Sequence, residues 1–329
     1  MTLLFLNRAD VRRALPMSEA IEGMKHAFAQ LSSGDAIVPQ RTQLPIAQHD
    51  GIAIFMPAYL AKSDALAVKI VSVFPQNLQR GMPSIHGVVV ALDSETGRPV
   101  ALLEGGTLTA IRTGAGSGAA TDLLARREAS VVAIIGSGVQ ARTQLEAVCT
   151  VRRIVEVRVF SPNREHARAF ADEMAGQTPI PDDISVSQSA ANAVRGADIV
   201  CTATSSKTPV LSGAALAAGS HVNAVGSFRT DMQEVDADTV SKALVVVDSR
   251  EAAREEAGDL MIPIEQGLFP FDHIHAELGE IVTGTRAGRT DDGQITYFKS
   301  VGVAVQDVIA ASIALRNARD QSLGQEIEL

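Results

Sequence analysis

The sequence predicts an α/β protein with a doubly wound parallel sheet in one domain and a discontinuous α+β second domain. Its 329 residues exceed what one ordinary hydrophobic core holds, which favours two domains. From Ala129 onward, apolar strand-like runs alternate with helix-like segments, as in parallel βαβ units. Apolar periodicity predicts a helix over Phe298–Gln321. No strand is predicted after this helix, so we expect it to fold back onto the first part of the chain. We therefore assign residues 1–120 plus 298–329 to one domain and residues 121–297 to the other.

The first domain mixes one helical and several extended segments. Apolar periodicity predicts a helix over Ala20–Leu31. The segment Asp93–Gly105 predicts a hairpin, with Thr96-Gly97-Arg98 at its turn. Further apolar runs predict strands at Ile52–Met56, Ala67–Phe74, His86–Leu92 and Val100–Leu103.

The second domain opens with a buried strand that runs into a glycine turn. Five apolar residues, Val131–Ile135, precede Gly136-Ser137-Gly138-Val139-Gln140-Ala141, a G-x-G-x-x-A pattern. Gly136 permits the tight turn, Gly138 lets the backbone approach a pyrophosphate, and Ala141 lets the helix over Gln140–Thr150 pack against the strand. The N-terminus of that helix favours a phosphate.

A Gly-x-Gly turn alone is weak evidence, because such turns occur by chance between strands and helices. Here the context supports a Rossmann domain that binds NAD(P), since strand-like runs follow in regular order. These runs are Val155–Phe160, Ile184–Val186, Ile199–Thr202, His221–Val225 and Ala243–Val247.

The end of the second strand bears on the choice of cofactor. An NAD site usually places a carboxylate here to bind the ribose hydroxyls, whereas this chain has Ser161, Pro162, Asn163 and Arg164. A hydroxyl, an amide and a guanidinium accommodate a 2′-phosphate. We therefore expect NADPH to be preferred over NADH, the alternative being that Arg164 is only a solvated residue in the first turn of the next helix.

Composition excludes several classes of protein. A net charge of −9 and 4% aromatic residues leave neither a basic face nor a stacking surface for nucleic acid. No apolar run reaches the roughly 20 residues that cross a bilayer, and the N-terminus lacks the pattern of a signal peptide. Cys149 and Cys201 have no C-x-x-C spacing and are expected to be buried and reduced, which favours the cytoplasm. No metal-binding motif is present.

Three cationic residues stand in mainly apolar surroundings and are the candidates for binding an anion. They are Arg41, Lys69 and Arg112. Lys69 interrupts an apolar strand, where an ammonium is costly unless it is paired or faces a ligand; the alternative is an edge-strand lysine turned to solvent. Arg112 is expected at the entry of a helix over Thr113–Ala120, whose free N–H groups would hold an anion beside the guanidinium.

Motifs from nearly the whole chain, in order, resemble those of the ornithine cyclodeaminase/mu-crystallin family. They are RTQLP (41–45), IFMPAY (54–59), Lys69, TGRPVALLEGGTLTAIRTGAGSGAAT (96–121), IIGSGVQA (134–141), HVNAVGSFRTDMQEVD (221–236), VVVDSREAAREEAGDL (245–260), AELGEIVTG (276–284) and FKSVGVAVQD (298–307).

The resemblance implies a homodimer whose discontinuous domain supplies the dimer interface and the substrate pocket, beside a Rossmann domain that carries NAD(P). By this resemblance Arg41, Lys69 and Arg112 are the catalytic and carboxylate-binding cations. Thr113 would contact the pyrophosphate. The residues expected beside the nicotinamide are Ala224, Val225, Ser300 and Val301.

Two departures indicate which reaction of the family to expect. Cyclodeaminases of the family place an Asp after the A-V-G turn and an acidic residue before M-P, where this chain has Ser227-Phe228-Arg229 and Ala53-Ile54-Phe55. Without these carboxylates a diamine is hard to bind and deprotonate. The chain is most similar to the ketimine reductase branch, which implies reduction of Δ1-pyrroline-2-carboxylate or Δ1-piperideine-2-carboxylate to L-proline or L-pipecolate. In that reaction Lys69 would orient the substrate carboxylate and help to hold the protonation state of the imine.

Other reactions remain open at this point. They are alanine dehydrogenation, ornithine or lysine cyclodeamination, hydroxyproline dehydration, and a binding role without turnover. His86 is a reserve candidate for proton relay. Asp231, with Glu234 and Asp236, is expected in a solvated loop cluster, so that Asp231 is only a weak candidate for the pocket.

Overall fold

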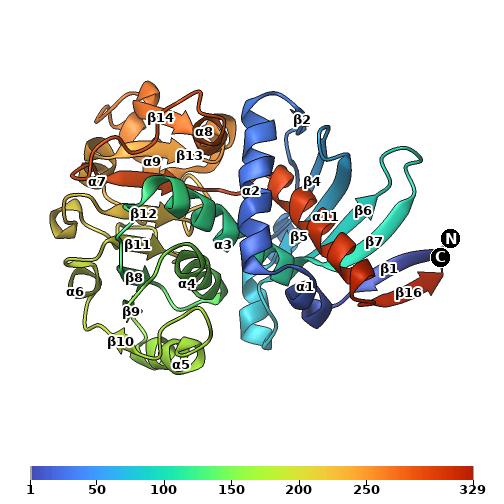
Figure 1. Cartoon of the computed structure of the whole chain (residues 1–329), viewed down its shortest axis with the longest axis horizontal. Coiled ribbons are helices and arrows are strands. Elements are labelled where there is room, and N and C mark those ends of the chain that lie inside the picture. Colours follow the sequence, from blue (N-terminus) through green and yellow to red (C-terminus); the bar gives the residue numbers. More distant parts are fainter. Residues whose placement is uncertain (1, 329) are drawn as a thin grey trace. The chain divides into compact units, whose positions relative to one another are not determined.

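The computed structural model describes residues 2–328, which group into two compact units (Figure 1). Unit 1 combines Met1–Arg112 with Ala304–Leu329, and unit 2 is Thr113–Val303. The α/β class predicted from the sequence is confirmed. The boundaries predicted at 120/121 and 297/298 separate the substrate-binding and dimerisation domain from the cofactor-binding domain, and they stay a prediction.

Unit 1 is built on a mixed sheet in the order β16-β1-β7-β6-β5-β4-β2, with β3 paired to β4. β1 is parallel to β7, and the other neighbours are antiparallel. The predicted hairpin forms between β6 and β7, with Gly97 at a positive φ of 71° in its turn. The strands are β1 (Thr2–Leu6), β2 (Ala36–Ile37), β3 (Thr42–Ile46), β4 (Gly51–Leu60), β5 (Ala65–Val73), β6 (Ile85–Leu92), β7 (Pro99–Glu104) and β16 (Gln325–Glu328).

Helices cover one face of this sheet. α2 (Met17–Ser32) and α11 (Ala304–Asp320) run side by side, and α11 packs on β4 and β5 (Figure 1). They approach closely because Gly23 has no side chain; a Cβ there would lie 2.5 Å from Ile313 Cδ1. The last helix therefore folds back onto the first part of the chain as predicted, but it begins at Ala304, and Phe298 belongs to a strand. The shorter elements are α1 (Arg8–Ala14), η1 (Ala47–His49) and η2 (Pro75–Arg80).

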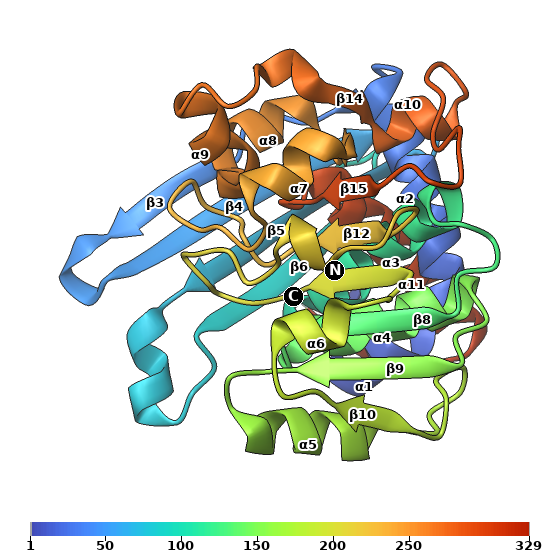
Figure 2. The same cartoon turned by 90° about the vertical axis from the view of Figure 1, so that its left-hand side faces the viewer.

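Unit 2 is built on a parallel sheet in the order β10-β9-β8-β11-β12-β15-β13-β14. The chain leaves β8 toward β9 and returns on its other side at β11, so the sheet is doubly wound about β8 (Figure 2). The predicted strands form within about one residue of their expected bounds, while β14 and β15 were not predicted. The strands are β8 (Val131–Ile135), β9 (Glu156–Phe160), β10 (Ile184–Val186), β11 (Ile199–Thr202), β12 (His221–Ala224), β13 (Leu244–Val247), β14 (Ile274–Glu277) and β15 (Thr296–Lys299).

Helices bury both faces of this second sheet. Leu145 of α4 and Phe170 of α5 belong to one core, and Val194 of α6, Val240 of α7 and Leu260 of α9 belong to the other. The central strands β11, β12 and β15 are buried on both faces, as expected of a parallel sheet. The helices are α3 (Gly105–Leu124), in which the chain passes from unit 1 to unit 2, α4 (Val139–Val151), α5 (Arg164–Met174), α6 (Ala190–Val194), η3 (Gly213–Ala215), α7 (Ala237–Lys242), α8 (Arg250–Glu256), α9 (Gly258–Glu265), η4 (Phe271–His273) and α10 (Leu278–Val282).

Within residues 2–328, none of the helices has the length and apolar character that a membrane span requires.

Candidate active site

The glycine turn joins β8 to α4, and its two glycines differ in backbone conformation and in the space around them. Gly136 has φ of +119°, and a Cβ there would lie 2.5 Å from the carbonyl oxygen of Ala203. Gly138 has an ordinary φ of −83°, and no atom lies within 4 Å of where its Cβ would be. The fold itself therefore requires the first glycine, whereas the second borders open space.

The start of α4 fits a phosphate group. Gly138 is the N-cap without a side chain to satisfy the first N–H groups of the helix. Val139 is 65% exposed. The buried Oε1 of Gln140 has no hydrogen-bond partner among the described residues, but as an acceptor it does not bind a phosphate oxygen. Sequence reasoning missed Arg142, whose Nη1 donates to the carbonyl oxygens of Ser137 (2.7 Å) and Gly138 (3.1 Å) and so braces the turn.

The end of β9 carries no carboxylate, as the sequence indicates. Ser161 is half-buried and Arg164 is exposed at the first position of α5. Asn163 is the N-cap of α5, because its Oδ1 accepts hydrogen bonds from the backbone N–H groups of Glu165 (3.0 Å) and His166 (3.2 Å). Its side-chain oxygen is thus engaged in capping, which leaves the amide NH₂ as the group that can meet a ligand.

The Glu234 carboxylate accepts hydrogen bonds from the backbone of the turn after β12. Its Oε2 accepts from the N–H groups of Gly226 (2.7 Å) and Ser227 (3.2 Å), and its Oε1 accepts from the N–H of Thr204 (2.6 Å). Glu234 is fully buried, so the expectation that it belongs to a solvated loop cluster is wrong. Ala224 and Val225, which precede the turn, are buried as well.

Two more buried charges complete this support. Lys299 Nζ lies 2.9 Å from Asp259 Oδ2 and donates to Ser227 Oγ at 2.7 Å. Asp259 Oδ1 accepts from the N–H groups of Glu234 and Val235 at 2.6 and 3.1 Å. Burial, and then the neighbouring Asp259 carboxylate, raise the pKa of Glu234. The Ser227 hydroxyl is therefore locked within the protein.

The segment after β15 is anchored by Asp248, at the end of β13. Asp248 Oδ2 accepts from the Ser300 hydroxyl (2.8 Å) and from the N–H groups of Val301 (2.9 Å) and Gly302 (2.7 Å). Asp248 is buried, and burial raises its pKa against the opposing effect of these donors. This carboxylate fixes Ser300 and Val301, and the sequence contains no local sign of that pairing.

In unit 1, Lys69 lies in the middle of an apolar row on the face of the sheet that α11 covers. The register places it between Met56 of β4 and Val89 of β6, and it is 3% exposed. β5 is an interior strand, so the edge-strand alternative is wrong. Such a buried ammonium requires a compensating charge.

Asp307, in the first turn of α11, supplies that charge. Its Oδ2 lies 2.6 Å from Lys69 Nζ, and its Oδ1 lies 3.1 Å from Arg112 Nε. Arg112 Nη1 also donates to Gln306 Oε1 at 2.8 Å. Arg112 is 5% exposed and Asp307 is 1% exposed. Two cations and one carboxylate therefore leave one positive charge in an apolar environment.

Arg112 is not at the entry of a helix, contrary to the prediction. α3 begins at Gly105, where the Glu104 carboxylate accepts from the N–H groups of Gly106 and Thr107, both at 2.8 Å. Arg112 therefore lies inside α3, where the following N–H groups are used by the helix and cannot bind an anion. The next residue of α3 is Thr113, the first residue of unit 2.

The surroundings of Lys69 bring its pKa close to physiological pH. Burial lowers its pKa to about 8; Asp307 opposes this effect, while Arg112 and the half-buried Arg41 add to it. The structure thus brings Lys69 and Arg112 together around Asp307, with Arg41 near enough to act on Lys69 electrostatically.

The reserve candidates lie elsewhere. His86 is exposed and alternates with Val88 and Val90, on the face of β6 opposite to Val89 and hence to Lys69. Asp231 is an exposed residue that pairs with Lys207 (2.8 Å) and Arg229 (2.9 Å).

Two further predictions concern thiols and metals. Cys149 and Cys201 are buried and unpaired as predicted, and burial raises the pKa of each to about 12. Among residues 2–328, no cluster of His, Cys, Asp or Glu side chains is suited to hold a metal ion.

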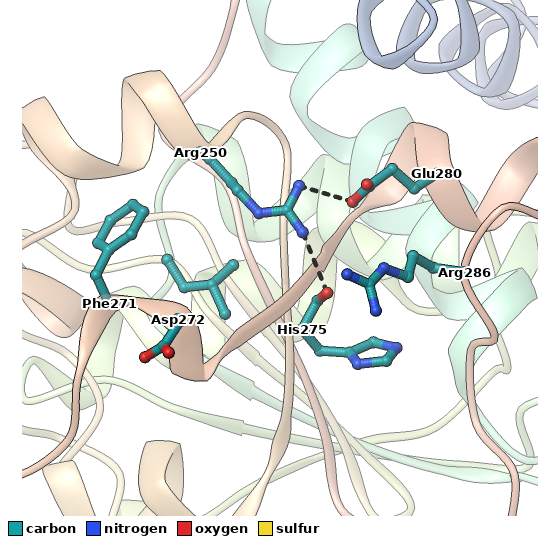
Figure 3. A pocket seen from close by; sticks show the side chains of 7 residues that line it. Arg250, Phe271, Asp272, His275, Glu280 and Arg286 are labelled. Carbon is teal, nitrogen blue, oxygen red and sulfur yellow. Dashed lines mark hydrogen bonds and ion pairs between the residues drawn. The ribbon is translucent and has the colours of Figure 1, made fainter.

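One surface pocket lies at the β14 edge of the unit 2 sheet, and none of the predicted site residues lines it (Figure 3). Arg250 Nη1 donates to Glu280 at 2.7 Å, and its Nη2 donates to the His275 carbonyl oxygen at 3.1 Å. Arg250 and Glu280 of this pocket already pair with each other, and we assign the pocket no role. Its lining residues are Arg250, Phe271, Asp272, Ile274, His275, Glu280 and Arg286.

Comparison with known proteins gives consistent matches over the whole chain. The model of the ornithine cyclodeaminase/mu-crystallin family matches residues 1–322. Delta(1)-pyrroline-2-carboxylate reductase of Bacillus cereus (strain ATCC 14579) is 45% identical over 327 residues, which cover 99% of this chain and 100% of that protein.

Two solved structures are similar in fold and sequence. Delta(1)-pyrroline-2-carboxylate reductase of Thermococcus litoralis, in complex with NADH and L-proline, superposes with a TM-score of 0.94 and 43% identity, covering 99% of this chain and 100% of the other. An archaeal alanine dehydrogenase dimer with bound NAD has a TM-score of 0.92 and 33% identity, with 100% of both chains covered.

Proposed function

The chain belongs to the ornithine cyclodeaminase/mu-crystallin family, and from that premise we propose that it is a ketimine reductase that uses NAD(P)H. Its substrate is a cyclic ketimine carboxylate, Δ1-pyrroline-2-carboxylate or Δ1-piperideine-2-carboxylate, and its product is L-proline or L-pipecolate. The similarity to reductases that act on the five-membered ring supports this reaction.

The observation that carries the proposal is the buried cluster of Lys69, Arg112 and Asp307. Its uncompensated positive charge lies in apolar surroundings, where a carboxylate ligand gains far more electrostatic energy than in water. Arg112 is suited to bind that carboxylate through its planar fork, with Arg41 as the second cation. The cluster therefore selects for an anionic substrate.

Lys69 is suited to a second task, which is control of a proton. The imine nitrogen must be protonated for its carbon to accept a hydride, and the reaction then yields a secondary amine. With a pKa of about 8, Lys69 is protonated at neutral pH and still able to exchange its proton. In this account Lys69 orients the substrate carboxylate and keeps the imine protonated, and no metal is needed.

The residues of unit 2 fit a nicotinamide dinucleotide, which supplies the hydride when it is bound. Open space beside Gly138 and the exposed Val139 at the start of α4 favour a pyrophosphate there. Asp248 and Glu234 keep the two segments proposed to border the nicotinamide in place. The residues that would hold the cofactor are Thr113, Gly136, Gly138, Val139, Gln140, Ser161, Asn163, Arg164, Ala224, Val225, Ser300 and Val301.

We propose NADPH as the preferred cofactor, with NADH as a poorer one. The support is chemical: the end of β9 presents Ser161, the Asn163 amide and the exposed Arg164, and no carboxylate that would repel a 2′-phosphate.

We also propose a homodimer formed through unit 1. The sheet face opposite to Lys69 carries a row of half-exposed apolar residues, and such a face favours burial against a partner. The alanine dehydrogenase relative is a dimer. The register aligns the row as Pro57, Val68, Val90, Leu102 and Phe5. The working domains are then residues 1–120 plus 298–329 for substrate and dimerisation, and 121–297 for the cofactor. The two reduced cysteines support a cytoplasmic enzyme.

A substrate panel tests the proposed reaction. NADPH absorbance is followed with Δ1-pyrroline-2-carboxylate, with Δ1-piperideine-2-carboxylate, with pyruvate plus ammonia, and with ornithine. We expect oxidation of NADPH with a cyclic imine alone. Oxidation only with pyruvate and ammonia would identify an alanine dehydrogenase, the activity of a relative at 33% identity. Consumption of ornithine without net loss of NADPH would identify a cyclodeaminase.

A further inference from the structure

Asp307 contacts both buried cations of the candidate site, Lys69 and Arg112. It is the carboxylate that contacts Lys69, at 2.6 Å, and its other oxygen faces Arg112 Nε at 3.1 Å. The charge of Asp307 and its side-chain hydrogen bond with Lys69 both favour the protonated form of Lys69, and the charge has the larger effect. Asp307 thus acts on both cations mainly through its charge.

Among residues 2–328, three charged groups act on Lys69. From α11 comes Asp307, from α3 comes Arg112, and from the segment before β3 comes Arg41. The neighbours of Lys69 on β4 and β6 are the apolar Met56 and Val89. Two of the three charged groups therefore oppose protonation of Lys69, and only Asp307 favours it.

We propose that Asp307 is a positioning residue that keeps Lys69 protonated in the free enzyme and shares Arg112 with the substrate carboxylate. An incoming carboxylate then adds a second negative charge to a cluster that Asp307 has already half neutralised. Asp307 holds Lys69 and Arg112 close together at a separation that their mutual repulsion would otherwise increase. This inference rests on the proposed function for its kinetic consequences, but the pairing itself can be measured without turnover.

The first consequence concerns the protonation of Lys69. Replacing Asp307 by Asn keeps the size of the side chain and removes its charge. Because that charge favours the ammonium form, the pKa of Lys69 must fall below its value of about 8, by about one unit or more. If protonated Lys69 is needed, the fall of kcat/KM at alkaline pH moves to lower pH by the same amount.

The experiment measures Lys69 directly. The wild-type protein and D307N, D307E and E19Q are labelled with ¹³C at the lysine ε-carbon, and the Lys69 signal is assigned by its loss in K69M. Its chemical shift is then followed from pH 6 to pH 11. E19Q is the matched control, because Glu19 also binds α11, through Arg316 at 2.8 Å and Asn317 at 3.0 Å, without contacting Lys69. We expect a lower pKa in D307N, a smaller change in D307E, and no change in E19Q. An unchanged Lys69 pKa in D307N would overturn the inference.

A double-mutant cycle covers the case in which D307N is too unstable to titrate. The free energy of unfolding is measured for wild type, K69M, D307N and K69M/D307N. Loss of Asp307 leaves two buried cations facing each other, so K69M must rescue part or all of the stability that D307N loses. Simple additivity of the two changes would contradict the inference.

The kinetic arm separates this inference from the proposed function. A wild-type protein that reduces no cyclic imine would refute the reaction, while the Lys69 titration would still decide the role of Asp307. A wild-type protein that reduces the imine, with the same pH profile of kcat/KM in D307N, would refute the role of Asp307 alone.

Discussion

The replacement Arg112→Met tests the proposed substrate cation most sharply. Methionine keeps much of the volume of the arginine stem and removes the charge and the fork, so changes in packing are kept small. In the wild type, Arg112 Nε lies 3.1 Å from Asp307 and Nη1 donates to Gln306. The variant therefore removes the guanidinium that we expect to bind the carboxylate, and it takes the charge of the cluster from plus one to zero.

The expected loss follows from the cost of a charge-assisted hydrogen bond. That cost is about 1.5–3 kcal/mol, which corresponds to a fall in kcat/KM of roughly 10- to 160-fold. Because Arg112 lowers the pKa of Lys69, its removal must raise that pKa. Protonated Lys69 is present below its pKa and lost as the pH rises through it, so the alkaline fall of kcat/KM moves to higher pH, the opposite of the D307N shift.

Initial rates with Δ1-pyrroline-2-carboxylate, measured between pH 6 and pH 10, give the fall in kcat/KM and the shift of its alkaline fall. R316A is the matched control, since it removes an exposed arginine of the same unit, which pairs with Glu19 at the surface and donates to Asn317 Oδ1. NADPH affinity is measured by fluorescence titration in each variant. An R112M enzyme with wild-type kcat/KM, or one in which NADPH affinity falls as far as kcat/KM does, would refute the assignment of Arg112.

Four further predictions concern Lys69 and the cofactor site. Lys69→Met should lose most of its turnover and keep NADPH affinity nearly unchanged, as judged by steady-state kinetics and fluorescence titration; a variant as active as the wild type would remove Lys69 from the site. Arg164→Asp should shift the ratio of kcat/KM values from NADPH toward NADH, whereas an unchanged ratio would return Arg164 to the role of a surface residue. Gly136→Ala should lower the free energy of unfolding by about 1–3 kcal/mol, because of its positive φ and the Ala203 carbonyl beside it. Gly138→Ala should keep the wild-type Tm, because nothing occupies the space of its Cβ, and lose NADPH affinity; retained affinity would place the pyrophosphate elsewhere.

The features that the sequence predicted best are those that one short segment determines. Val131–Ile135 reads as a buried strand because both faces of a parallel sheet are covered, and the structure has β8 at those residues. Lys69 and Arg112 stand out because a charge among apolar residues needs a partner, and both are buried in the structure.

The features that were missed depend on partners far apart in the chain. Asp307 belongs to a helix far from Lys69 in sequence, although a carboxylate within the apolar AVQDVIAASIAL was a sign that could have been used. Asp248 and Glu234 likewise act on backbone groups that only the fold brings to them. The start of α3 was misplaced because glycines at 105 and 106 lower helix propensity, while the Glu104 side chain compensates by capping the helix.

Transfer of deuterium tests the central claim most directly. The enzyme is given Δ1-pyrroline-2-carboxylate and NADPH that carries deuterium at the transferred position of the nicotinamide, and the product is examined by mass spectrometry and NMR. The account predicts one deuterium at the α-carbon of L-proline for each NADPH oxidised. Proline without deuterium at that carbon, or no oxidation of NADPH by a folded protein, would contradict it.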